Sequence, residues 1–160
     1  MRPMSSIRVN LDRIDRALLH QLQSDGRISN TELAERAGLS QSACLRRVQR
    51  LEAAGIIEGY GARLDAAALG KAETVFIEIT LTHQSETALD AFERAVAASP
   101  DILECHLMAG EYDYLLRVAV SDSADYERLH RKQLTTLPGV ARIRSHFALR
   151  RVSRQVGLPL

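Results

Sequence analysis

The stretch AGLSQSACLRRVQRL, residues 37–51, contains a helix end, a tight turn and the start of a further helix. Gly38 is typical of the position just past a helix C-terminus, and Ser40 is a favoured N-cap residue. A turn this short that contains a glycine sets two helices at the steep angle of a helix-turn-helix. The stretch therefore predicts that the helix after Ser40 is the one that contacts DNA.

Two helices are expected before this turn. Apolar residues recur at spacings of three and four over residues 11–22, which predicts a first helix that ends at Gly26. Ser29 and Glu32 form a Ser-x-x-Glu capping box that opens a second, short helix. These signals predict a three-helix domain.

The helix after Ser40 has an apolar line that includes Cys44 and Leu51. At about 100° per residue, its polar side chains lie on the opposite face or its flank, where Arg and Gln match base edges and phosphates. No acidic residue lies within residues 41–51, so positive charge gathers there although the net charge is only +1. The alternative is a solvated face whose arginines pair with Glu35 or Glu52. The candidate DNA-binding residues are Gln41, Ser42, Arg46, Arg47, Gln49 and Arg50.

The pattern changes after Gly55. Ile56–Gly61 reads as a strand or small wing, and alternating strand and helix signals begin at Glu73. The order βαββαβ predicts a four-stranded antiparallel sheet with both helices on one face. The expected architecture is α+β, with a (winged) helix-turn-helix domain over residues 1–60, a linker over 61–72 and a ferredoxin-like domain over 73–160. The expected elements are strands Glu73–Thr82, Ile102–Ala109, Tyr114–Val120 and Val140–Val152, and helices Ser85–Ala98 and from a Ser123 cap.

The two faces of this sheet differ in the sequence pattern. We expect Leu103, Cys105 and Leu107 to share one face of the second strand, and Leu149 to share a face of the last strand with Ile143. The uncovered face mixes apolar and charged side chains, which suggests contact with another copy of the chain. The alternative is a solvated face with scattered apolar residues. This face carries Phe76, Glu78, Glu104, His106, Met108, Leu115, Arg117, Arg142, Arg144 and His146.

Composition limits the other classes of function. Hydrophobic residues make up 46% of the chain, so disorder is disfavoured. Cys44 and Cys105 belong to no CxxC pair, the histidines lack metal-ligand spacing, and no nucleophile motif is present. We expect no catalytic residue, no metal and no cofactor. Residues 1–9 lack an apolar stretch and no segment nears the roughly 20 apolar residues of a membrane helix, so we expect a cytoplasmic protein without signal peptide or membrane contact.

Several runs of residues carry a family resemblance. LDRID at 11–15 and LQSDGRIS at 22–29 are followed by CLRRVQRLE at 44–52 with GII at 55–57, and then by ECHLMAGEYDYLL at 104–116 and LPGV at 137–140. In order, and over nearly the whole chain, these runs resemble the Lrp/AsnC (leucine-responsive, feast/famine) transcriptional regulators. They correspond to that family's opening segment, recognition helix and wing, sensor hairpin and last turn.

The resemblance implies a sequence-specific regulator that binds double-stranded DNA and responds to an amino acid or related small molecule. It implies a homodimer joined through the ferredoxin-like domains, assembled further into tetramers, octamers or larger forms. The amino acid would bind in a cleft lined by the sensor hairpin and the turn before the last strand. The effector-binding residues would be Met108, Ala109, Gly110, Glu111, Tyr112, Asp113, Thr135, Thr136, Leu137 and Pro138.

The chemistry of the hairpin residues suits an amino acid. Exposed N–H groups around Gly110 could hold an α-carboxylate, and Glu111 or Asp113 could hold an α-ammonium. Alternatively, Gly110 serves only for its φ angle and Asp113 only closes the turn.

The sequence leaves two other classes of function open. Some haem-pathway decarboxylases resemble the same two-domain architecture, so an enzyme is the second hypothesis; the groove-suited side chains after Ser40 count against it. The third is a nucleoid-like architectural protein that wraps DNA without a ligand.

Overall fold

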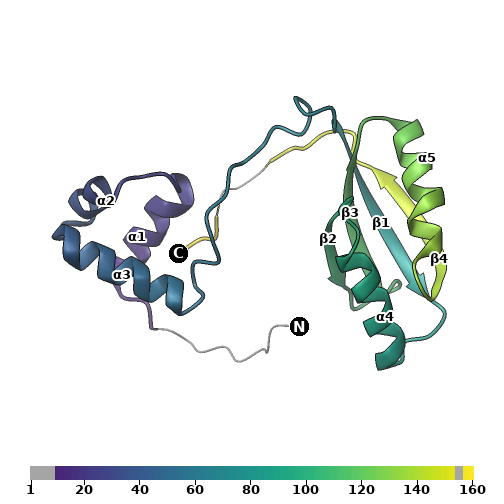
Figure 1. Ribbon diagram of the computed structural model, residues 1–160, viewed down its shortest axis with the longest axis horizontal. Coiled ribbons are helices and arrows are strands. Elements are labelled where there is room, and N and C mark those ends of the chain that lie inside the picture. The colour runs from purple at the N-terminus through teal and green to yellow at the C-terminus, as the bar shows by residue number, and fades with distance from the viewer. Residues whose placement is uncertain (1–9, 154–156) are drawn as a thin grey trace. The chain divides into compact units, whose positions relative to one another are not determined.

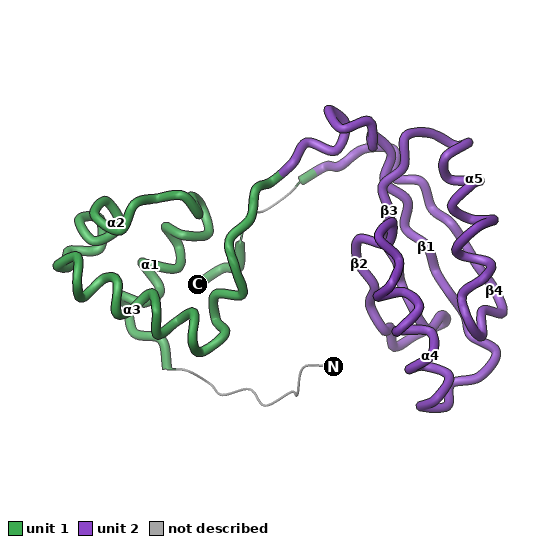
Figure 2. Tube along the Cα trace, viewed as in Figure 1, with its two compact units in different colours: residues 1–63, 153–160 green, residues 64–152 purple. Residues whose placement is uncertain are grey.

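A computed structural model describes residues 10–153 and 157–160; residues 1–9, for which no signal peptide is expected, lie outside the described residues. The chain forms two compact units, residues 1–63 with 153–160 and residues 64–152 (Figure 2). The helical unit, the first of the two, includes the described residues 153 and 157–160. Within that unit, the backbone N–H of Leu158 donates to Gln23 Oε1 (2.5 Å), and Gln23 Nε2 donates to the Leu158 carbonyl (3.2 Å).

The first unit is built from helices (Figure 1). Each of its three described helices has a side-chain cap at its start. Ser29 and Ser40 accept hydrogen bonds from the backbone of the second and third helices, as expected. At the first helix, the cap is Asp12, which forms a reciprocal capping box with Asp15. The helices are α1 (Arg13–Ser24), α2 (Asn30–Ala37) and α3 (Gln41–Ala53).

The strand expected over Ile56–Gly61 is absent. The N–H groups of Ile56 and Ile57 both donate to the carbonyl of Leu51 (3.0 and 3.3 Å), so the segment begins as the end of α3. The described residues of the helical unit contain no second strand, and a lone segment has no partner for its ladder hydrogen bonds. Tyr60 instead donates through its hydroxyl to Glu52 Oε1 on α3 (2.9 Å).

The second unit is a four-stranded antiparallel sheet with two helices on one face, as predicted (Figure 1). The strand order is β2-β3-β1-β4, which is the order of the ferredoxin-like fold. None of the described helices is both long and apolar enough to cross a membrane. The elements are β1 (Glu73–Leu81), α4 (Glu86–Ala97), β2 (Ile102–Leu107), β3 (Tyr114–Val120), α5 (Ser123–Lys132), the 3₁₀ turn η1 (Leu134–Thr136) and β4 (Val140–Phe147).

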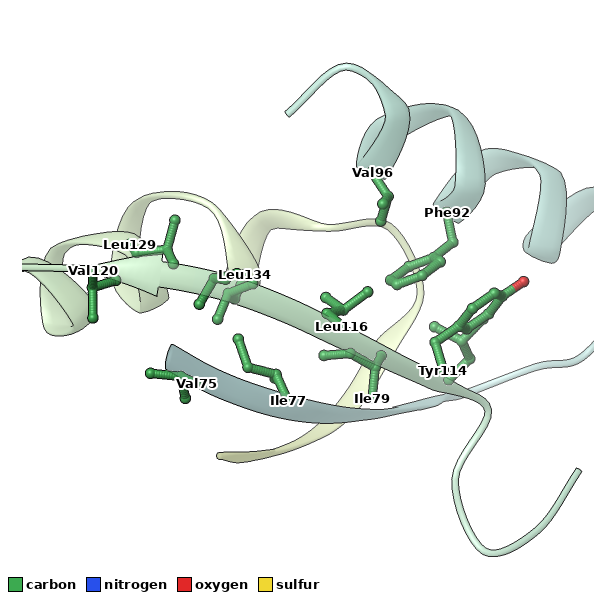
Figure 3. Close-up of a cluster of buried hydrophobic side chains, with 12 residues drawn as sticks. Val75, Ile77, Ile79, Phe92, Val96, Tyr114, Leu116, Val120, Leu129 and Leu134 are labelled. Carbon is green, nitrogen blue, oxygen red and sulfur yellow. The ribbon is translucent and has the colours of Figure 1, made fainter. Parts of the chain in front are cut away.

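The core of this unit lies between the sheet and its two helices. Alternate residues of β1 and β3 are buried, in agreement with the period of two in the sequence. Phe92 of α4 lies against Tyr114 of β3, with ring centroids 4.5 Å apart (Figure 3). The packing of α4 and α5 on this face leaves the other face of the sheet without a helix.

One expectation about the edge strands was wrong. Leu103 and Leu107 line one hollow with Cys105 and Tyr114, yet they are 49% and 60% exposed, because β2 is an edge strand with a register irregularity near its start. The last strand ends at Phe147 rather than at residue 152, since Phe147 already pairs with Val75 near the start of β1. Leu149 is consequently fully exposed instead of facing the core.

The start of α5 is held by an acidic residue that the sequence did not single out. Asp122, not Ser123, is the N-cap residue, and its side chain accepts from the N–H of Asp125. Asp125 accepts from Lys71 Nζ (2.8 Å), from the Ser121 N–H (3.1 Å) and from Arg128. The Lys71 hydrogen bond, with the other two, holds the pKa of Asp125 well below its usual range.

This depressed pKa predicts a loss of stability in acid. A carboxylate whose folded pKa lies below its unfolded value of about 3.9 stabilises the fold above that value and less as pH falls through it. Asp125→Asn is expected to lower the melting temperature of the sheet unit at pH 7 and to flatten its decline below about pH 5. Thermal melts at several pH values, with Asp90→Asn on α4 as a control, check this; parallel acid curves for wild type and Asp125→Asn would contradict it.

Candidate functional site

The turn between α2 and α3 has the geometry of a helix-turn-helix. Gly38 ends α2 in the left-handed region (φ 66°), and the Leu39 N–H donates to the carbonyl of Ala34 (2.9 Å). Asn30 Nδ2 at the start of α2 donates to the carbonyl of Gln41 at the start of α3 (3.0 Å). The relative orientation of α2 and α3 is therefore fixed both by the turn and by this hydrogen bond between their first residues.

The predicted faces of α3 are confirmed. Cys44 and Leu51 are fully buried, and Cys44 packs in a core with α1 and α2. Arg46 and Gln49 are exposed, and their side chains have no hydrogen-bond or ion-pair partner among the described residues. Of the six candidate DNA-binding residues, only Arg47 is half-buried; those exposed are Gln41, Ser42, Arg46, Gln49 and Arg50.

Two of the three arginines on α3 form ion pairs, but not with the glutamates considered from the sequence. Arg47 Nη1 donates to Asp12 Oδ2 (2.7 Å) and to Asp15 Oδ1 (2.8 Å). Arg50 Nη2 donates to Asp15 Oδ2 (2.6 Å). The tertiary structure thus brings two carboxylates from the start of α1 to a helix that has no acidic residue of its own until Glu52.

The electrostatics of this cluster follow from its hydrogen bonds. The Asp15 N–H, followed by the Arg47 guanidinium, lowers the pKa of Asp12, and hydrogen bonds to Asp12 and Asp15 raise the pKa of Arg47. Arg46 differs from Arg47 and Arg50, because no described residue neutralises its charge. An Asp-x-x-Asp pattern at the start of α1 was the available sequence signal for the cluster.

The hairpin between β2 and β3 is closed by Asp113. The Met108 N–H donates to the carbonyl of Asp113 (2.8 Å), and the Asp113 carboxylate accepts from the Leu81 N–H (2.7 Å) and from Gln84 Nε2 (2.6 Å). Asp113 is only 8% exposed, so both of its carboxylate oxygens are used within the chain. Gly110 has no positive φ and open space where a Cβ would lie, so the idea that it serves for its φ angle is wrong.

The other predicted effector segment lies at the same end of the sheet. The Thr82 N–H donates to the carbonyl of Gly139 (2.8 Å). The preceding residue, Leu81, donates its N–H to the Asp113 carboxylate. Both segments are thus attached to consecutive residues at the end of β1. Among the predicted positions, Ala109, Gly110, Glu111, Thr135, Thr136 and Pro138 are exposed, while Met108, Tyr112 and Leu137 are half-buried.

Sequence reasoning missed the loop between β1 and α4. It lines an open hollow of about 630 Å³ formed by Leu81, Thr82, His83, Gln84, Ser85 and Ala88. Gln84 connects this hollow to the hairpin through its bond to Asp113. The loop has no motif of its own, so only its tertiary position marks it as part of the candidate site.

The uncovered face of the sheet carries two cross-strand polar pairs among the described residues, one of them an ion pair. Arg117 Nη2 donates to Glu104 Oε1 (2.6 Å), which is the first cause of the lowered pKa of Glu104. His146 Nε2 lies 3.2 Å from Glu78 Oε1. Phe76 lies between these pairs in the register and is 37% exposed. Among residues 10–153 and 157–160, no three His, Cys, Asp or Glu side chains come together as a metal site.

Comparisons with known proteins agree with both halves of this description. A family profile described as winged helix-turn-helix DNA-binding matches residues 11–58, and one described as Lrp/AsnC ligand binding domain matches residues 74–158. The chain is 45% identical over 145 residues to the leucine-responsive regulatory proteins of Escherichia coli and Salmonella typhimurium. The aligned region covers 91% of this chain and 88% of each of those proteins.

Solved structures show the same fold. An AsnC family transcriptional regulator from Agrobacterium tumefaciens superposes with a TM-score of 0.88 at 34% identity, covering 93% of this chain and 97% of the other. A transcriptional regulator from Neisseria meningitidis, solved as a complex with L-Met, has a TM-score of 0.87 at 34% identity, covering 93% and 96%.

Proposed function

The chain belongs to the Lrp/AsnC family of transcriptional regulators, and from that premise we propose a separate function for each of its two units. Residues 1–60 bind a specific DNA duplex through α3, residues 73–160 bind an amino acid and join copies of the chain, and residues 61–72 link the two. The protein is a cytoplasmic regulator and not an enzyme. The observation that carries the proposal is that Arg46 and Gln49 are exposed and have no partner among the described residues, on a helix whose other face is buried.

The exposed face of α3 has the chemistry that a major groove selects. An arginine fork fits the acceptors of guanine, a glutamine amide fits adenine, and Ser42 reaches either base or phosphate. Gln41 lies in the first turn of α3, where a recognition helix makes its base contacts. Arg47 and Arg50 are part of the proposed interface, although each is already engaged with α1.

We place the effector at the end of the sheet where the hairpin, the 135–138 segment and the 82–85 loop meet. The L-Met complex of the Neisseria meningitidis protein supports an amino acid as the ligand class. The exposed backbone at Ala109 and Gly110 offers N–H donors for an α-carboxylate, and Glu111 offers a carboxylate for an α-ammonium. Asp113 acts in this arrangement by holding the hairpin, because its own oxygens are occupied.

We propose that the uncovered sheet face joins two copies of the chain. Phe76 supplies an exposed apolar centre, and the flanking Arg117–Glu104 and His146–Glu78 pairs supply the polar rim that interfaces of this kind have. Pairs of such homodimers would assemble into tetramers, octamers or larger forms, which bring several α3 helices to one DNA duplex.

A combined selection and ligand screen tests the proposal. The protein is used to select duplexes from a random pool about 30 base pairs long, enough for two half-sites a helical turn or more apart. Its melting temperature is then measured with each amino acid; a ligand at 100 times its Kd stabilises by about 2.7 kcal/mol, on the order of 5–10 °C here. The expected effector also changes the affinity for the selected duplex.

The outcomes separate the competing classes. Enrichment of a sequence without any amino-acid effect would favour a nucleoid-like architectural protein. No enrichment, together with a visible absorption band in the purified protein, would favour the haem-pathway enzyme.

A further inference from the structure

Asp15 is a buried carboxylate at the start of α1, and the proposed function gives it no role. Its side chain is 1% exposed, whereas Asp12 beside it is half exposed. A buried carboxylate is stable only if its charge is paired and its oxygens are hydrogen-bonded. Asp15 meets that requirement through α3, because one oxygen accepts from Arg47 and the other from Arg50.

The two arginines are held to different degrees. Arg47 is 27% exposed, and its Nη1 is shared between Asp12 and Asp15. Arg50 is 51% exposed and uses only Nη2 toward Asp15. A guanidinium carries five N–H donors in one plane, so the remaining edge of Arg50 keeps donors that have no partner among the described residues.

We infer that Asp15 is a positioning residue that aims the free edge of Arg50 at a base edge and thereby sets sequence specificity. This inference rests on the proposed function, since it requires α3 to contact DNA. An arginine whose plane is fixed by a carboxylate is preorganised for one bidentate partner, whereas an untethered arginine adapts to many phosphates. Arg47 donates to both Asp12 and Asp15 and so holds the two carboxylates in place.

The same network limits binding to arbitrary DNA. Asp12 and Asp15 together neutralise the charge of Arg47 and Arg50, which leaves Arg46 as the α3 arginine without an intramolecular counterion among the described residues. Non-specific affinity grows with the number of cations that displace counterions from phosphates. Asp15 therefore raises sequence specificity in two ways. It orients Arg50, and it neutralises positive charge that would otherwise bind phosphates of any sequence.

The test compares wild type with Asp15→Asn on a duplex selected by the wild-type protein and on a scrambled duplex of equal composition, across a salt series. Asp15→Asn is expected to reduce the ratio of the two affinities about tenfold, within the range for loss of one bidentate base contact. Binding to the scrambled duplex is expected to strengthen, with its salt slope steeper by about 1, because Arg50 is released while Arg47 stays paired with Asp12. A purely structural role would not steepen that slope.

Two further variants make the result specific. Glu32→Gln removes an equal charge from the same unit, where Glu32 pairs with Arg36 on α2, and is expected to leave the ratio unchanged. Arg50→Lys keeps the charge and the Asp15–Arg47 pair but lacks the planar fork. It is expected to lower the ratio by a similar factor, and it keeps the inference open to refutation if Asp15→Asn does not fold by circular dichroism.

The outcomes that would refute this inference differ from the outcome that would refute the proposed function. An unchanged ratio in Arg50→Lys, or in folded Asp15→Asn, would overturn the inference while leaving α3 as the DNA-binding helix. If the wild-type protein selected no sequence from the pool, the proposed function itself would fail, and this inference with it.

Discussion

Arg46→Ala is expected to weaken binding to the selected duplex by about 10- to 100-fold at fixed salt, because one arginine contact to guanine contributes about 1–3 kcal/mol. Arg46 is exposed on α3, and no described residue offers it an alternative partner. Alanine is a better helix former at an exposed position, so the melting temperature should change little. Fluorescence anisotropy with the selected duplex measures the affinity, and gel filtration checks that assembly is unaltered.

Arg94→Ala is the matched control for this experiment. Arg94 is an exposed arginine on α4, so its removal takes away the same charge from the other unit. We expect its effect on affinity to stay within about twofold, the size of a screened long-range charge effect. Equal affinities for wild type and Arg46→Ala would remove Arg46 from the interface and would weaken the assignment of α3 as the helix that contacts DNA.

Asp113→Ala is expected to abolish the amino-acid response while leaving binding to the selected duplex within about threefold of wild type. The substitution removes the acceptor for the Leu81 N–H and for Gln84 and releases the hairpin from the end of β1. A buried donor left without its partner costs about 1–3 kcal/mol, so the sheet unit should also melt earlier. The thermal shift on saturation with the effector, compared with the shift of wild type, measures the response.

Two further variants test whether Asp113 supports the hairpin or contacts the ligand through its charge. Asp113→Asn keeps an oxygen that accepts from the Leu81 N–H, so a restored response there would assign Asp113 to support of the hairpin. Asp90→Ala, on the exposed side of α4, should respond like wild type. A full response in Asp113→Ala would move the effector away from this end of the sheet.

The secondary structure could largely be predicted because its signals are local. Ser29, Gly38 and Ser40 act on backbone groups within a few residues of themselves, so helix starts and ends follow from neighbouring sequence. The period of two in β1 likewise identified its buried face. Of the two alternatives for Ile56–Gly61, the strand was wrong because a strand needs a partner, and the described part of the helical unit has none.

The candidate sites were predicted less completely, since they depend on contacts between distant residues. Helical periodicity places Arg50 on the open face of α3, but it does not reveal that Asp15, 35 residues earlier, binds one of its nitrogens. The hairpin residues were expected to meet a ligand directly, yet Asp113 faces Leu81 and Gln84, 32 and 29 residues away.

By itself, the sequence determined the order of helices and strands, the helix-turn-helix and the family, because capping, periodicity and motif spacing act over a few residues or are read along the chain. Only the tertiary structure decided which charges are free. Ion pairing and burial depend on distances that folding creates. Arg46 therefore has no partner among the described residues, whereas Arg47 and Arg50 are held by α1, and Asp113 closes a hairpin instead of facing solvent.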